Sequence, residues 1–159
     1  MNPEINTGGV GVVIRKGADG QPMAFVTQLF TRVLPELDPV KVRADVRATL
    51  LERRAAAKAA ALAPDPALEE VAQRYADALA AAGGNLSDAD AEKLFSAVTR
   101  KYKEINLVSG AKADPLEFAA DPSLLGKSGK ALGAGAARGR HPVLGKNAVY
   151  VVVLTATKR

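Results

Sequence analysis

Side chains that commonly catalyse reactions or bind metals are scarce in this chain of 159 residues. There is no cysteine and one histidine, which excludes a disulfide framework, a thiolate zinc site, a cysteine nucleophile and any site built on two histidines. The histidine lies in the turn sequence Arg140-His141-Pro142 and has no obvious serine partner that it could activate as a general base. We therefore predict that His141 is an exposed turn residue, and that the chain has no catalytic residue, no metal site and no cofactor.

Carboxylates are the remaining candidates for acid–base chemistry. Asp88, Asp90 and Glu92 cluster where a helix is expected to begin, and the positive end of a helix dipole explains such a cluster without catalysis. Glu104 precedes a short apolar segment, and a buried carboxylate beside a cleft could be functional. Glu104 is therefore the single candidate cleft residue, and a surface or capping role is its alternative.

Two glycine-containing motifs resemble phosphate-binding loops only in part. Gly126-Lys127-Ser128 matches the end of a P-loop, but that motif needs a glycine five residues before Gly126, where Asp121 stands. Gly133 and Gly135 are followed by Gly139 with one residue too many for a dinucleotide-binding fingerprint. We expect a nucleotide site at neither position.

The balance of charge leaves binding to polyanions open. Lys and Arg outnumber Asp and Glu by 22 to 17, giving a net charge of +5, which permits contacts with phosphate-rich partners. Aromatic residues for stacking on bases are few, so nucleic acid is an unfavoured partner. The candidate polyanion contacts are Arg43, Arg47, Arg54, Lys58, Arg138 and Arg140.

Helical patterns occupy the middle of the chain. Asp38, Asp65 and Ser87 are typical N-caps, the first two followed by a proline that suits the first helical position. The predicted helices cover about residues 39–62, 66–82 and 88–102, with short helical starts at Asp114 and Asp121. Tyr75 and Tyr102 fall on the apolar stripes and are predicted to be core residues.

Strands are predicted near both ends of the chain. The predicted strands are residues 10–14, 24–30, 105–109, 131–137 and 148–154. The first two flank an Asp19-Gly20 turn and form a hairpin. Neither face of its second strand is wholly polar, so we expect this strand to be largely covered.

The two predicted hairpins resemble each other. Gly9-Val10-Gly11-Val12-Val13 corresponds to Gly133-Ala134-Gly135-Ala136-Ala137, and residues 25–30 correspond to residues 150–155. Glycines at alternate positions leave one face of a strand without side chains, so that a helix or another backbone can approach closely. Three helices between two such hairpins indicate one mixed sheet covered by helices.

Four further stretches share a pattern with one known family. They are residues 50–55 with 63–68, residues 71–76, residues 104–110, and residues 133–153. In this order and spacing they resemble the opening helix with its "DPAL" segment, the "A-Q-x-x-A" helix, the "G-E-N" strand and the closing hairpin of the CAP superfamily (cysteine-rich secretory protein, antigen 5 and pathogenesis-related 1). The resemblance implies an α+β fold, namely an α-β-α sandwich whose mixed, mostly antiparallel sheet is covered by helices, and an extracellular or cell-envelope location.

The chain departs from that family at its metal-binding cleft. Many members carry two histidines and two acidic residues there, but the corresponding segments around Asn85 and at 121–125 contain no histidine, and Glu104 is displaced from the acidic motif. We therefore expect no enzyme, but a non-catalytic binding or assembly module of the bacterial cell envelope or secreted fraction. The alternatives are a basic protein that binds polyanions or nucleic acid, and a carrier of hydrophobic ligands between helices and sheet.

Two domains are predicted: an N-terminal hairpin over residues 1–34 and a CAP-like domain over residues 35–159. The hairpin resembles the closing hairpin of a preceding CAP-like unit, which indicates a fragment of a tandem array or a permuted variant. Its edges could bind a protein partner or a second copy of the chain. No apolar run approaches the roughly 18 residues of a membrane span, and the N-terminal residues resemble no signal peptide.

Overall fold

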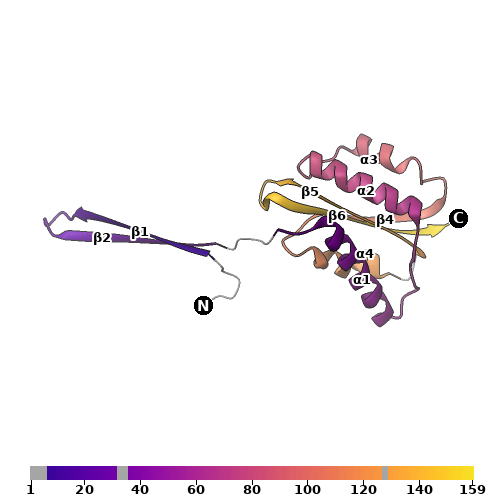
Figure 1. Cartoon of the computed structure of the whole chain (residues 1–159), viewed down its shortest axis with the longest axis horizontal. Helices are drawn as coiled ribbons and strands as arrows, with labels where there is room; N and C mark the ends of the chain where they lie inside the picture. The colour runs from indigo at the N-terminus through magenta and orange to yellow at the C-terminus, as the bar shows by residue number, and fades with distance from the viewer. Residues whose placement is uncertain (1–6, 32–35, 127–128) are drawn as a thin grey trace. The chain divides into compact units, whose positions relative to one another are not determined.

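The computed structural model describes residues 7–31, 36–126 and 129–159. The chain divides into two units, Met1–Pro35 and Glu36–Arg159, which are described separately. Unit 1 contains strands β1 (Thr7–Lys16) and β2 (Pro22–Thr31). The helices and the other strands of the described residues belong to unit 2 (Figure 1).

The hairpin of unit 1 forms around the predicted Asp19-Gly20 turn. All ten residues of β1 pair with β2 in antiparallel register. Asp19 accepts a hydrogen bond from the amide of Gln21 at 3.1 Å, and Gly20 adopts a φ of 77°, which glycine takes without steric cost. The expectation that the second strand is covered is wrong within this unit, because its described residues include no helix and every residue of both strands is exposed.

The helices of unit 2 begin at the three predicted N-caps. Side-chain oxygens of Asp38, Asp65 and Ser87 accept hydrogen bonds from backbone amides two or three residues ahead, which satisfies donors that the first turn of a helix leaves free. The three helices are α1 (Pro39–Ala56), α2 (Pro66–Ala81) and α3 (Asp88–Phe95).

Two of these helices end earlier than the periodicity predicts. The helix α1 stops at Ala56 because Lys58 takes a left-handed φ of 53°, which ends the regular helical geometry. After α3, the chain continues in tight turns, in which Val98 donates to the carbonyl of Phe95 at 2.9 Å. Tyr102 is buried as expected, but it is the first residue of a strand.

A four-stranded sheet forms the middle of unit 2. The strands are β3 (Ala63–Pro64), β4 (Tyr102–Ala111), β5 (Ala131–His141) and β6 (Gly145–Lys158), arranged in the order β3-β5-β6-β4. The pair β3–β5 is parallel, and the pairs β5–β6 and β4–β6 are antiparallel. The three longer strands contain the segments predicted from sequence, and the mixed, mostly antiparallel sheet is confirmed.

Helices cover both faces of this sheet, so the predicted α-β-α sandwich is confirmed. Figure 1 shows α2 and α3 on one face and α1 and α4 (Pro122–Leu125) on the other; a short 3₁₀ helix, η1 (Pro115–Ala120), packs with α1. Alternate residues of β6 supply the two cores: Tyr150, Val152 and Leu154 belong to the α2 side. Val151 and Val153 belong to the α1 side.

The helix α2 approaches β5 at backbone distance. A Cβ added to Gly133 would lie 2.3 Å from the carbonyl carbon of Leu68, and one added to Gly135 would lie 2.3 Å from the carbonyl oxygen of Ala72. These distances are far below van der Waals contact, so the glycines are required here. The close approach predicted from the alternating glycines is confirmed.

Candidate functional site

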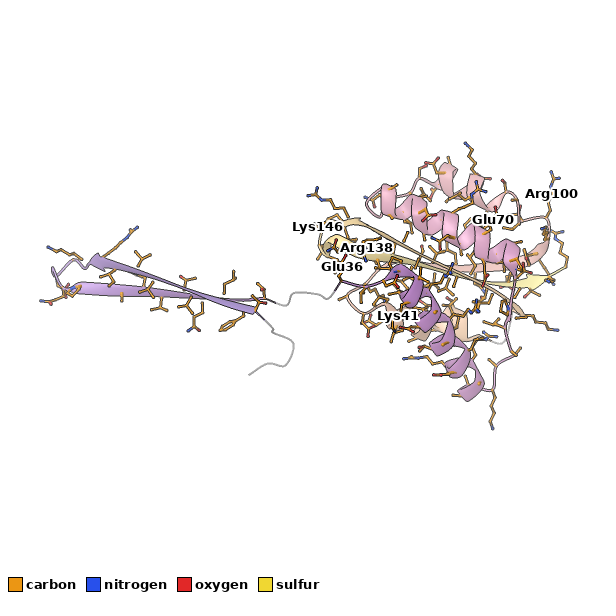
Figure 2. The ribbon with its side chains drawn as sticks, viewed as in Figure 1. Glu36, Lys41, Glu70, Arg100, Arg138 and Lys146 are labelled. Atoms are coloured by element: carbon orange, nitrogen blue, oxygen red, sulfur yellow. The ribbon has the colours of Figure 1, made fainter. Side chains whose placement is uncertain are left out.

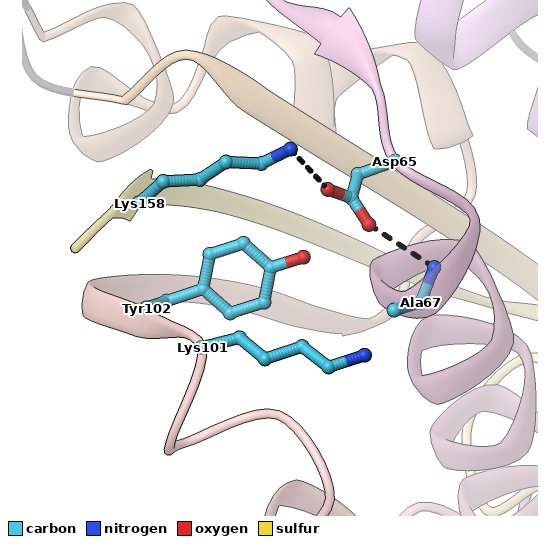
Figure 3. A pocket seen from close by; sticks show the side chains of 5 residues that line it. All are labelled: Asp65, Ala67, Lys101, Tyr102 and Lys158. Carbon is cyan, nitrogen blue, oxygen red and sulfur yellow. Dashed lines mark hydrogen bonds and ion pairs between the residues drawn. The ribbon is translucent and has the colours of Figure 1, made fainter.

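A buried carboxylate joins the start of α2 to two strands of the sheet. Asp65 caps α2 by accepting a hydrogen bond from the amide of Ala67 at 3.1 Å. Its other oxygen lies 3.2 Å from the ammonium nitrogen of Lys158 at the end of β6. The hydroxyl of Tyr102, at the start of β4, donates a further hydrogen bond to the same carboxylate. We call Asp65, Tyr102 and Lys158 the Asp65 cluster (Figure 3).

The surroundings shift the pKa values of Asp65 and Tyr102. Burial by itself raises the pKa of Asp65, but hydrogen bonds from Tyr102, Lys158 and the Ala67 amide outweigh it and lower that pKa below its usual value. Burial, followed by the hydrogen bond to Asp65 and its negative charge, raises the pKa of Tyr102 to about 12. Asp65 is therefore ionised and Tyr102 neutral at physiological pH, and neither is suited to proton transfer there.

A cavity of about 290 Å³ lies beside the cluster and is lined by Asp65, Ala67, Lys101, Tyr102 and Lys158. Figure 3 shows the side chains of Lys101 and Lys158 around the aromatic ring of Tyr102. Two ammonium groups and one carboxylate leave this cavity with one excess positive charge. The arrangement can receive a small anionic group, while the carboxylate itself is already satisfied by its three donors.

The two acid–base candidates from sequence lie elsewhere. Glu104 is exposed on β4, paired in register with Thr157, and does not line this cavity; the interpretation of Glu104 as a buried cleft carboxylate is therefore wrong, and its surface alternative holds. His141 is the last residue of β5 and is half-buried, directly before the β5–β6 turn, so the prediction of an exposed turn residue is wrong. Its Nδ1 accepts hydrogen bonds from the amides of Val143 and Leu144 at 3.1 and 3.2 Å, which orders the β5–β6 turn.

The acidic residues at the start of α3 have the structural role predicted for them. The amide of Asp90 donates to Ser87 Oγ at 3.2 Å, and Ser87 Oγ donates to the carboxylate of Asp90 at 2.6 Å. Asp88 and Asp90 both lie in the first helical turn, where the helix dipole stabilises negative charge. Among the residues that the structure describes, no group of three or more His, Cys, Asp and Glu side chains could hold a metal ion.

One member of the predicted polyanion set is buried. Arg54 is 1% exposed, and its guanidinium donates to the carbonyl oxygens of Ala60, Leu124 and Gly126. It ties the end of α1 to the end of α4 and cannot reach a polyanion, so the proposal that Arg54 contacts one is wrong. A basic side chain with this many carbonyl partners is a structural element. The sequence contains a signal for its burial, because Arg54 continues the four-residue spacing of Val42, Val46 and Leu50, the other buried residues of α1.

The other basic candidates are distributed over unit 2. Arg138 pairs with Glu36 (Figure 2) and donates to the carbonyl of Leu37, whereas Arg140 and Lys58 are exposed. Arg43 and Arg47 come together on α1, where they line a shallow cavity of about 380 Å³ with Val40, Ala44, Ala48 and Leu51. Arg47 also forms an ion pair with Glu69 at 2.6 Å.

The Asp65 cluster is a site that the sequence patterns do not predict. Asp65 was predicted as an N-cap and Tyr102 as a core residue, and both roles are confirmed. Their convergence with Lys158 depends on β4 and β6 being neighbours in the sheet. The one local signal was an acidic N-cap directly before an apolar helix. Lys127 and Ser128 of the P-loop-like segment lie outside the described residues.

No family model and no curated protein matches this sequence. Among solved structures, an outer surface protein from Borrelia burgdorferi is similar, with a TM-score of 0.60 and 15% sequence identity. The match covers 79% of this chain and 98% of that protein, an extent close to that of unit 2. It shows a shared fold. Within the described residues, no helix is long and apolar enough to cross a membrane.

Proposed function

We propose that this protein is a non-catalytic binding or assembly module of the bacterial cell envelope or secreted fraction, built on a CAP-like scaffold. The observation that carries the proposal is the fold of the chain, 79% of which matches a bacterial outer surface protein over 98% of that protein's length. The sequence stretches that resemble CAP proteins all lie in unit 2. They fall in α1, α2, β4 and the β5–β6 hairpin.

The chemistry of the described side chains supports binding over catalysis. The carboxylate with the most hydrogen-bond donors, Asp65, is held ionised between Tyr102 and Lys158, and the histidine orders a turn through its acceptor nitrogen. Each of these groups stabilises the fold through partners it already has. What remains for function is the exposed surface of unit 2 and the apolar strands of unit 1.

Location is tested on the epitope-tagged gene product in its own bacterium. We expect it in the envelope or culture-fluid fraction, and degraded when intact cells are treated with protease, while a cytoplasmic marker survives. Recovery with the cytoplasmic marker, protected until the cells are lysed, would overturn the envelope role.

The absence of metal-dependent catalysis is tested by isothermal titration of the purified chain with zinc, magnesium and calcium. We expect no stoichiometric binding. Tight binding by the native chain that is lost in Glu104→Ala, but kept in the control Glu92→Ala at another exposed carboxylate, would restore the metal-site hypothesis.

A polyanion-binding role is the second candidate, and the groove on α1 favours it because Arg43 and Arg47 line the same cavity. We expect binding of heparin to a column to weaken steeply with salt, because each phosphate- or sulfate-like contact releases counterions. Arg43→Gln should elute at clearly lower salt, whereas Arg53→Gln, an exposed residue of α1 outside that cavity, should elute like the native chain. Equal elution of the two variants would remove this candidate.

A further inference from the structure

The hairpin of unit 1 presents apolar side chains on two opposite faces. Successive residues of a strand point to opposite sides, and directly paired residues share a side. We define the glycine face as Gly9, Gly11, Val13, Phe25, Thr27 and Leu29, and the valine face as Val10, Val12, Ile14, Ala24, Val26, Gln28 and Phe30. The large apolar members of both faces are between 53% and 70% exposed. An isolated two-stranded hairpin is at best marginally stable in water, so both faces call for a cover.

The cross-strand pairs of the β1–β2 hairpin correspond to those of the β5–β6 hairpin of unit 2. Gly9 lies opposite Leu29 as Gly133 lies opposite Leu154, and Gly11 lies opposite Thr27 as Gly135 lies opposite Val152. Val13 lies opposite the aromatic Phe25, as Ala137 lies opposite the aromatic Tyr150. The sequence repeat is therefore matched by a repeat in pairing register, in which each of these positions of one hairpin has an equivalent on the same face of the other.

In unit 2, this hairpin geometry is covered by helices on both sides. The face that contains Gly133 and Gly135 packs against the backbone of α2, and the opposite face packs against α1. In unit 1, a Cβ added to Gly9 or Gly11 would meet nothing within 4 Å. The glycine face of unit 1 thus has the flat surface that accepts a helix backbone, and no described residue of unit 1 fills it.

We propose that β1 and β2 are the central strand pair of a second three-layer unit, and that their partner is a helical segment. Its first helix packs Ala-type residues at backbone distance on the glycine face, and a second amphipathic helix covers the valine face. The large apolar side chains of the two faces are each more than half exposed, so both faces leave apolar surface for such helices to cover. This inference does not rest on the envelope role.

A second copy of the hairpin is a poorer occupant than helices. Stacked hairpins would cover one face of each and leave the other in water, whereas sheets pack about 10 Å apart, too far for the close approach that paired glycines permit. Two helices satisfy both faces at once, as α1 and α2 do for β5–β6.

The experiment extends the full chain at its N-terminus with a second copy of residues 36–126, which carry α1 to α4 of unit 2 without its hairpin. We expect amide hydrogen exchange of residues 10–14 to slow at least tenfold relative to the unextended chain. Gly11→Leu in the extended chain should abolish this protection by filling the glycine face, and Val12→Leu on the opposite face should retain most of it.

Two outcomes would overturn the proposal. One is an extended chain whose hairpin amides exchange as fast as in the unextended chain. The other is protection of the hairpin already in the unextended chain, accompanied in sedimentation equilibrium by a dimer that Val12→Lys and Val26→Lys dissociate, because this would assign both faces to a second copy.

Discussion

Asp65 combines two tasks at the residue scale. It caps α2, it forms an ion pair with Lys158 of β6, and it accepts a hydrogen bond from the hydroxyl of Tyr102 of β4. Three elements that are distant in sequence therefore meet at one carboxylate, which remains charged because its donors offset the cost of burial. The contacts of Asp65 with Tyr102 and Lys158 therefore stabilise the fold most while the carboxylate is ionised.

The lowered pKa of Asp65 predicts a dependence of stability on pH. A carboxylate whose pKa is lower in the folded than in the unfolded state stabilises the fold above the unfolded value, roughly 3.9, and loses this contribution as the pH falls through the folded value. When the pH is lowered from about 6 into the acid range, the free energy of unfolding should therefore decrease less in the Asp65→Asn variant than in the native chain. Urea denaturation at each pH measures this decrease. An acid dependence in Asp65→Asn that is unchanged from the native chain would contradict the assignment.

The burial of Arg54 predicts that substitutions of Arg54 and of its neighbour Arg53 differ in their effect on the free energy of unfolding. Arg54→Met should lower the free energy of unfolding by roughly 2–4 kcal/mol, because buried carbonyl oxygens on Ala60, Leu124 and Gly126 lose a charged donor. Arg53→Met, on the exposed side of the same turn, should change it by less than about 0.5 kcal/mol. Equal effects in urea denaturation would show that the guanidinium is not a structural donor.

At the scale of elements, the contact between α2 and β5 is the tightest packing in unit 2 for which glycine is required. Ridges of side chains normally separate a helix from a sheet, but Gly133 and Gly135 let the helix backbone come within a distance that no side chain tolerates. The strand therefore sets the position of α2, and through it the position of the Asp65 N-cap at its start.

The same glycines give a prediction that compares the two hairpins. Gly135→Ala should destabilise the chain by at least about 2 kcal/mol, because its Cβ would overlap the backbone of α2 at Ala72. Gly11→Ala, at the equivalent position of β1 with nothing within 4 Å, should leave thermal unfolding unchanged or slightly improve it. Similar losses in the two variants, measured by calorimetry, would mean that β1 is already packed against a neighbour.

At the scale of the whole molecule, the chain joins a complete three-layer unit to a hairpin that has the surface of another such unit's centre. Nearly all the buried apolar side chains lie in two clusters on opposite faces of the sheet of unit 2, and the largest group of exposed ones lies on β1 and β2. Stability and association are therefore expected to reside in different parts of the chain.

Removal of residues 1–34 tests this separation. We expect the melting temperature of unit 2 to change by less than about 2 °C, which is below the shift that 1 kcal/mol produces in a domain of this size. Any concentration-dependent association in sedimentation velocity should decrease at the same time, because the exposed apolar side chains have been removed. A large loss of thermal stability would show that the hairpin is part of the core of unit 2.

Much of the fold follows from signals that act over a few residues. The N-caps Asp38, Asp65 and Ser87, the Asp19-Gly20 turn and the alternating glycines were predicted correctly, because each depends on backbone geometry and on neighbours close in sequence. The ends of α1 and α3 were not, since they are set by a left-handed Lys58 and by the burial of Tyr102 at the start of a strand.

The sequence by itself determined that sites built on cysteine or on two histidines are excluded, and where most elements begin. Only the tertiary structure decided that Asp65, Tyr102 and Lys158 converge and that Arg54 is buried while Glu104 is exposed. It also decided that helices of unit 2 cover the β5–β6 hairpin, whereas no described residue of unit 1 covers the β1–β2 hairpin. The physical reason is that the hydrogen bonds of caps and turns depend on residues close in sequence, whereas burial depends on which distant segments the sheet order brings together.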